Sequence, residues 1–288
     1  LFQKNIPDFH FRKGVPEDVV NNFEVVEKLL ALSYYEYKFI DEAYSKALLT
    51  FEMAMNFRYK AITKNNKNET FNNLITKLSN LNVFDTPLEQ LKIIKDLRND
   101  YAHPKNHNYA GIFFWKSAEF INHLINEMYE DVELRMERQK LTKDLDHKLQ
   151  ELNLNRGCVI EIQGTLTILY RLQLLMINNK SNPHTYIFAC TPLFDLKRSE
   201  SGSIIIPHSF KAKLTEVVFK DFCLSGISYT AKERITFIPI EANKALQKDY
   251  NQWISEFEMT ESNWMFEQCM GHHIEDFFIP ELREFQKF

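Results

Sequence analysis

Glycine, paired cysteines and long apolar runs are scarce in this chain, and each scarcity excludes a class of protein. Only 7 of the 288 residues are Gly, beside 24 Phe and 12 Tyr, a balance that favours helices and an aromatic core. The 4 cysteines are scattered without any Cys-x-x-Cys spacing, so neither a zinc site nor a disulfide framework is indicated. We therefore expect no metal, no cofactor and buried thiols in a reducing, cytoplasmic compartment.

Membrane segments and a broad basic surface are missing as well. No apolar run approaches the roughly 18 residues that cross a bilayer, and the first residues show no basic-then-apolar signal pattern. The formal net charge of -4 argues against a protein that coats nucleic acid, so any RNA contact must be local. The first residue is Leu, which leaves open whether the natural start lies upstream.

Residues 1–130 are predicted to form an all-helical domain. Apolar residues at helical spacing indicate helices that start near residues 16, 33, 71, 86 and 109, of which the second runs to about residue 64. Ser33 and Thr86 each open a capping box, in which a hydroxyl and a following Glu satisfy the first N–H groups of a helix. We expect both residues to be N-caps.

Residues 131–156 are predicted to form a charged helix with a sparse apolar seam. Two interpretations remain open for it: a solvated linker between two domains, or an arm through which two copies of the chain associate.

Residues 157–288 show the alternation of strands, clearest over residues 165–174, and end in a helix at about 246–257. Further strands are expected at residues 186–190, 203–206, 216–219, 225–229 and 235–240. This half contains no nucleotide-binding loop, metal motif or nucleophile elbow, so its role stays open. The expected fold class is α+β, with a helical bundle followed by a β-rich domain with terminal helices.

Residues 97–104 carry the densest chemistry of the chain. Arg98 falls in the middle of the apolar stripe of its helix, where an unpaired guanidinium would be costly. Asn99 follows it, and His103 precedes Pro104, which places the imidazole at the end of the helix. A structural ion pair of Arg98 is the simple interpretation. An arginine, an amide and a histidine together could also handle a phosphodiester.

This segment resembles the Arg-x4-His motif of the HEPN superfamily, and the likeness covers about residues 16–130, where a long helix, a short helix, the motif and another long helix follow one another. The resemblance implies a HEPN-like helical bundle and places Arg98, Asn99 and His103 in an active site. Members that keep the motif are commonly metal-independent endoribonucleases of toxin-antitoxin and phage-defence systems. They usually build the site from two copies at a homodimer interface, and an antitoxin or defence-system protein is a possible partner.

The RNA substrate is expected to be single-stranded or looped, because attack by the 2′-OH needs a backbone freedom that a duplex restricts. We expect Arg58, Lys105 and His107 to contact it. Arg58 lies on the apolar stripe of the long second helix, and pairing with Glu52 or Asp100 is the alternative for it. Lys105 occupies the place where some relatives carry a tyrosine that a partner nucleotidyltransferase modifies, so that control is not expected here. The alternative function is a non-catalytic HEPN scaffold or ligand-binding module. In that case Arg98 would hold the helices together through Asp100 or Glu52, and the C-terminal domain would do the recognition.

Overall fold

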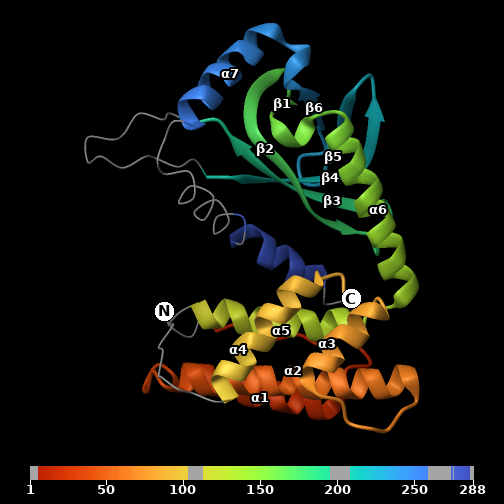
Figure 1. The fold of residues 1–288 in the computed structure, drawn as a ribbon. Helices are drawn as coiled ribbons and strands as arrows, with labels where there is room; N and C mark the ends of the chain where they lie inside the picture. The colour runs from red at the N-terminus through yellow and green to blue at the C-terminus, as the bar shows by residue number, and fades with distance from the viewer. Residues whose placement is uncertain (1–5, 103–112, 195–207, 259–273, 275, 286–288) are drawn as a thin grey trace. The chain divides into compact units, whose positions relative to one another are not determined.

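The computed structural model of this chain describes residues 6–102, 113–194, 208–258, 274 and 276–285 (Figure 1). Its contacts divide the chain into two compact units. Unit 1 comprises Leu1–Arg135 and Arg283–Phe288, and unit 2 comprises Met136–Leu282. Within the described ranges, no helix is both long enough and apolar enough to cross a membrane.

Unit 1 is organised around one long central helix. Its helices are α1 (Glu17–Leu32), α2 (Phe39–Thr63), α3 (Phe71–Asn80), α4 (Leu88–Ala102) and α5 (Phe113–Met128), followed by the start of α6 (Val132–Glu151). Helix α2 packs against α1, α3, α4 and α5 (Figure 1). Ala43, Ala47 and Ala54 of α2 are fully buried, and these small side chains let the neighbouring helices approach closely.

The two predicted capping boxes are not formed. Ser33 ends α1 instead of starting α2, and its hydroxyl donates a hydrogen bond to the carbonyl of Leu30 over 2.6 Å. Helix α2 starts at Phe39 without a side-chain cap. The hydroxyl of Thr86 donates to the carboxylate of Glu127 over 2.9 Å. A hydroxyl can therefore satisfy a distant partner as well as its own helix, which sequence spacing does not distinguish.

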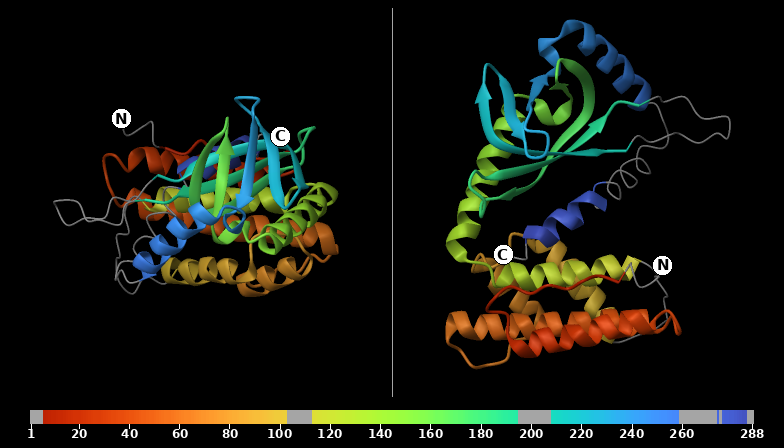
Figure 2. Two further views of the ribbon diagram at one scale, coloured as in Figure 1. Left: turned by 90° about the horizontal axis from the view of Figure 1, so that it is seen from above. Right: turned by 180° about the vertical axis from the view of Figure 1, so that it is seen from behind.

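Unit 2 contains a closed antiparallel barrel (Figure 2). Its strands are β1 (Cys158–Ile162), β2 (Thr165–Asn178), β3 (Thr185–Pro192), β4 (Phe210–Lys220), β5 (Cys223–Ser228) and β6 (Arg234–Pro239). Each strand pairs with the next along the chain, and β1 also pairs with β6. Short 3-10 helices, η2 (Leu154–Arg156) and η3 (Ile240–Ala242), flank the strands, and α7 (Lys244–Glu258) follows them. Closure leaves no unpaired edge among these strands.

The second half of α6 belongs to the core of the barrel. Leu145 and Leu149 are buried there, and Leu141 and Leu152 pack against the same core. In this part of the charged segment, the apolar seam therefore faces the barrel core. It does not form a solvated linker or an arm for self-association there. Such a helix covers apolar side chains that the strands alone would leave in contact with water.

Strand β1 is buried on both faces. Cys158 and Ile160 lie in the barrel core, while Val159 packs with Ile240 and Tyr250 on the other side. Its burial therefore does not alternate along the sequence, and a search for alternation does not find it. A strand that is covered on both faces is typically apolar throughout.

The fold class expected from the sequence is wrong. A closed six-stranded antiparallel barrel stands where an undefined β-rich domain was expected, and unit 1 is not a clear HEPN-type all-helical bundle. Unit 1 is not built from residues 16–130 alone, because it also takes in the start of α6 and residues from the C-terminal end. Only the loose description as α+β holds. The predicted strand at residues 203–206 lies outside the described residues.

Two free thiols lie inside the barrel. Cys158 of β1 and Cys190 of β3 are fully buried members of its core, and neither forms a disulfide. Burial raises the pKa of both thiols well above the usual value for cysteine. Both are therefore held as neutral, unreactive thiols at neutral pH.

The entry to β1 depends on a glycine. Gly157 has φ +124°, a conformation that side-chain-bearing residues rarely adopt, and the ring of Tyr250 occupies the space that a Cβ would take. The Tyr250 hydroxyl donates a hydrogen bond to the carbonyl of Arg156. The glycine thus allows the backbone to turn and leaves space for the ring of Tyr250 from α7.

Replacing Gly157 with alanine should destabilise unit 2 by roughly 3 kcal/mol or more, because an added Cβ meets the Tyr250 ring and strains the backbone. Gly164→Ala is a matched control, since Gly164 also has positive φ, +78°, but nothing within 4 Å of the added Cβ. It should cost only about 1 kcal/mol. Urea unfolding of the two variants measures the difference, and equal losses would show that Tyr250 does not press on residue 157.

Candidate active site

The guanidinium of Arg98 is held by a carboxylate from another helix. Its Nε and Nη2 atoms both donate to Oε2 of Glu52, over 3.1 Å and 2.7 Å. Arg98 comes from α4 and Glu52 from the central helix α2, so the contact joins two helices that are far apart in sequence. The side chains of the pair are 24% and 22% exposed. The guanidinium is therefore fixed in orientation, yet it is not sealed from solvent.

An aromatic ring also lies close to Arg98. The centre of the Arg98 guanidinium lies 5.8 Å from the ring centroid of Phe71, the first residue of α3. Thr70 caps α3, since its hydroxyl accepts a hydrogen bond from the backbone N–H of Asn73 over 3.4 Å. A cation near an aromatic face gains about 0.5–1 kcal/mol at a partly exposed position. Elements α2, α3 and α4 thus all position this one side chain.

The structure brings only part of the predicted site into view. Asn99 belongs to α4, but its side chain lies outside the described residues, as do His103, Lys105 and His107. His103 follows Ala102, the last residue of α4, directly in the sequence. The described part of the site is therefore the arginine together with its carboxylate and its aromatic neighbour.

Arg58 does not join Arg98, and it does not pair with Glu52. Arg58 follows Glu52 by six positions along α2, a rise of about 9 Å. Its guanidinium lies 5.3 Å from the ring centroid of Tyr129, and its buried Nε has no hydrogen-bond partner among the described residues. The Tyr129 hydroxyl donates to the carbonyl of Ala54 over 3.2 Å. Burial raises the pKa of Tyr129 to about 12, so this donor stays protonated.

A buried carboxylate beside α4 was not predicted from the sequence. Glu127 of α5 is only 4% exposed and accepts hydrogen bonds at the chain entry to α4. Its donors are the backbone N–H of Asp85, the backbone N–H of Thr86 over 2.7 Å and the Thr86 hydroxyl. Burial raises the pKa of Glu127 to about 7, and the nearby Asp85 charge adds to the effect. The signal in the sequence was an acid set between Ile125 and Met128 on an apolar helix face.

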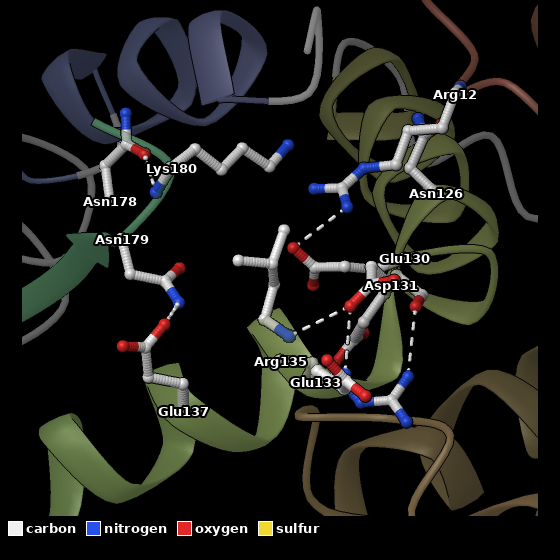
Figure 3. A network of polar contacts seen from close by, with 12 residues as sticks. Arg12, Asn126, Glu130, Asp131, Glu133, Arg135, Glu137, Asn178, Asn179 and Lys180 are labelled. Atoms are coloured by element: carbon white, nitrogen blue, oxygen red, sulfur yellow. Dashed lines mark hydrogen bonds and ion pairs between the residues drawn. The ribbon is translucent and has the colours of Figure 1, made fainter. Parts of the chain in front are cut away.

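Further buried charges, those of Arg12, Glu130 and Arg135, lie around the end of α5 and the start of α6, and each has a partner (Figure 3). Arg12 Nη1 lies 2.9 Å from Oε1 of Glu130, with side chains 8% and 1% exposed. Arg135, the first buried arginine of α6, donates from Nη1 to the carbonyl of Val83 over 2.9 Å. These contacts tie the N-terminal segment, the end of α5 and the start of α6 to the entry of α4.

Comparison with known proteins identifies no relative. No family model matches the chain, and neither a curated protein nor a solved structure matches it significantly. What the chain does is therefore argued from its own residues.

The raised pKa of Glu127 predicts that the free energy of unfolding of unit 1 decreases as the pH rises from about 4 to about 7. An unfolded glutamate has a pKa of about 4.3, so between that value and about 7 the folded state binds the extra proton. The proton on Glu127 therefore stabilises the folded state. This contribution is complete below the pKa of the unfolded state and is lost as the pH rises through the pKa of the folded state. Glu127→Gln, which stays neutral, should therefore be more stable than wild type above pH 7, by up to roughly 3 kcal/mol, and about equal to it near pH 4.

Denaturant unfolding of both proteins at a series of pH values from 4 to 9 measures this difference. Glu27→Gln, at an exposed position of α1, is the matched control and should show no such trend. A stability difference between Glu127→Gln and wild type that does not change with pH would contradict the prediction.

Proposed function

We propose that the chain is a metal-independent endoribonuclease that cuts single-stranded or loop RNA, with Arg98 and His103 as its catalytic pair and Asn99 beside them. The observation that carries the proposal is the Arg98 guanidinium. It is fixed on Glu52, remains partly exposed, and precedes His103 by five residues in the sequence, where α4 ends at Ala102. A charged donor held in a fixed orientation is what stabilisation of a phosphate-centred transition state requires.

RNA brings its own nucleophile, so the chemistry needs few groups. The 2′ oxygen forms a bond to phosphorus while the bond from phosphorus to the 5′ oxygen breaks, which leaves a 2′,3′-cyclic phosphate. A base takes the proton of the 2′-OH, and an acid gives one to the leaving 5′ oxygen. Histidine, with an ordinary pKa near 6.5, can do either at cellular pH. Arg98 would donate to the non-bridging oxygens, whose negative charge grows in the transition state.

Glu52 would act as a positioning residue. A guanidinium has five N–H donors, and the contact with Glu52 uses Nε and Nη2. Without a carboxylate, the long side chain of Arg98 would sample several rotamers, and each productive encounter would have to restrict it again. The ion pair is thus compatible with catalysis, although it also neutralises part of the charge.

One motif supplies one histidine, whereas the reaction uses both an acid and a base. A homodimer that brings two copies of His103 into one cleft would supply both groups. The function would then depend on assembly, and a protein partner such as an antitoxin could control it by covering the shared cleft. RNA as substrate and free, buried cysteines suit a reducing cytoplasm.

A second candidate function is a non-catalytic scaffold or ligand-binding module, and the Arg98–Glu52 ion pair itself favours it. In that case the pair only ties α4 to α2, which is a sufficient reason for an arginine on an apolar stripe. The two candidates differ in what substitution does. A structural pair affects stability alone, whereas a catalytic one also affects cleavage.

Purified protein in excess EDTA should cut unstructured RNA and leave 2′,3′-cyclic phosphate ends, and His103→Ala should lower the rate at least about a hundredfold, the scale for a general acid-base group. His147→Ala, at an exposed histidine of α6, is the matched control and should cut like wild type. Arg98→Lys keeps the charge but loses the forked donor, so its rate should fall about tenfold or more.

Mass spectrometry of the ends and denaturant unfolding of every variant complete the experiment. Equal cleavage by wild type and His103→Ala would assign the activity to a contaminant or to another site. Loss of stability in Arg98→Lys and Glu52→Gln without cleavage by any protein would favour the scaffold.

The composite site also predicts a homodimer. Light scattering across a concentration series should give twice the mass of the chain at concentrations where cleavage is observed. A chain that stays monomeric while it cuts RNA at full rate would remove the two-histidine site.

A further inference from the structure

An exposed tyrosine of unit 2 has two lysines over its ring. Tyr229 follows β5 directly, and it is 45% exposed. The ammonium group of Lys213, from β4, lies 4.6 Å from the centroid of the Tyr229 ring, and that of Lys232 lies 5.0 Å from it. All three residues belong to unit 2, and none of them is part of the proposed nuclease site.

The turn between β5 and β6 holds the backbone of Tyr229 in place. The N–H of Tyr229 donates to the carbonyl of Lys213 over 2.8 Å, and the N–H of Ser228 donates to the carbonyl of Glu233 over 2.8 Å. The N–H of Lys232 donates to the carbonyl of Ser228 over 3.0 Å. The backbone that carries the ring and the two lysines is thus fixed before any ligand binds, which reduces the entropy lost on binding.

Lys232 has an unusual backbone conformation. Its φ is +57°, in the left-handed region that Gly and Asn adopt most easily. A lysine at this position costs free energy, but it brings a charged side chain to Tyr229. Strained residues of this kind cluster at ligand-binding segments. The carboxylate of Glu233, the next residue, is occupied elsewhere, because it accepts a hydrogen bond from the amide of Gln163.

The lysines around Tyr229 are only partly compensated. Lys213 is held by Glu281, since its ammonium group donates to Oε2 of Glu281 over 2.7 Å. Oε1 of the same carboxylate accepts from Lys211, so one carboxylate serves two ammonium groups. Lys232 is exposed, and among the described residues no carboxylate forms an ion pair with it. Positive charge therefore remains on this surface, although the chain as a whole has a net charge of -4.

We propose that this surface, the ring of Tyr229 with Lys213 and Lys232, binds single-stranded RNA. A base packs on the ring, and the ammonium groups hold the phosphates on either side of it. Surfaces that bind single strands combine an exposed aromatic ring with cations in this way, and stacking accepts any base because every base has a π-face. Ammonium groups are held only weakly over an exposed ring, so they can move to phosphate oxygens when a base approaches.

Other polyanions fit this surface less well. An acidic peptide would use the charges but not the exposed ring, and in a duplex the bases are stacked on one another and cannot pack on it. The choice of RNA rests on the proposed nuclease function. The inference itself concerns where the strand is bound and not where it is cut.

Fluorescence anisotropy of the full chain with a labelled single-stranded 2′-O-methyl oligoribonucleotide tests this surface. The methyl group blocks the nucleophile of the cleavage reaction, so binding is measured whether or not the chain cuts RNA. Tyr229→Ala should weaken binding about tenfold, the scale of one base–aromatic stack, and Tyr229→Phe should stay within about twofold of wild type. Phe222→Ala, at an 81% exposed aromatic residue of the turn between β4 and β5, is the matched control and should bind like wild type.

The role of the charge is tested by the dependence of binding on salt. Lys232→Gln should reduce the slope of log affinity against log salt concentration by about 1, because one phosphate contact is lost. Lys220→Gln, at the exposed last residue of β4, is the matched control and should leave the slope unchanged. An abasic oligonucleotide of the same length should bind more weakly than the complete one, and Tyr229→Ala should not weaken it further.

Thermal unfolding of each variant without ligand verifies that the fold is kept. Equal binding by wild type and Tyr229→Ala would overturn the inference, and so would equal affinity for the abasic and the complete oligonucleotide. Tyr229-dependent binding to phosphatidylserine vesicles, without binding of the oligonucleotide, would assign the surface to a membrane instead.

Failure of this inference and failure of the proposed nuclease function give different results. Tyr229-dependent binding by a chain that cuts no unmethylated RNA would uphold the binding surface and remove the nuclease. Cleavage of unmethylated RNA by a chain whose binding is unchanged in Tyr229→Ala would uphold the nuclease and remove the binding surface.

Discussion

Unit 1 depends on the compensation of the charged groups that lie in its interior. Arg12 meets Glu130, Arg98 meets Glu52, and Arg135 donates to a backbone carbonyl. An uncompensated ion in such surroundings would cost several kcal/mol, which is comparable with the whole stability of a domain. The helices can therefore pack only in an arrangement that brings these partners together. Glu127 is compensated differently, because its carboxyl group accepts hydrogen bonds from Asp85 and Thr86 and burial raises its pKa to about 7.

The sequence predicted the chemistry around Arg98 better than it predicted the chemistry around Glu127. An arginine on an apolar stripe must find a partner, and Glu52 was among the few candidates, because it lies on the long helix that was expected beside it. Glu127 binds backbone N–H groups of a segment 41 residues away. Backbone donors carry no sequence signature, so no spacing rule could have indicated this contact.

The barrel was not predicted for a similar reason, because the contacts that close it leave no local pattern in the sequence. Alternation marked β2, because one face of that strand is wet, but it missed β1, where Cys158 and Val159 are buried on opposite faces. The pairing of β1 with β6 closes the barrel across about 75 residues, and no local pattern encodes a contact of that length. The capping boxes at Ser33 and Thr86 failed for a related reason, since Ser33 lies at the end of α1 and the Thr86 hydroxyl donates to the distant Glu127.

The two buried thiols allow opening of the barrel to be measured without an added label. Alkylating reagents react with a thiolate, and neither Cys158 nor Cys190 can ionise or be reached while the strands stay paired. Their modification at neutral pH must therefore wait for the strands to separate, and its rate measures how often the barrel opens. Because Cys158 lies in β1, one of the two strands of the closing pair, its labelling rate reports on closure itself.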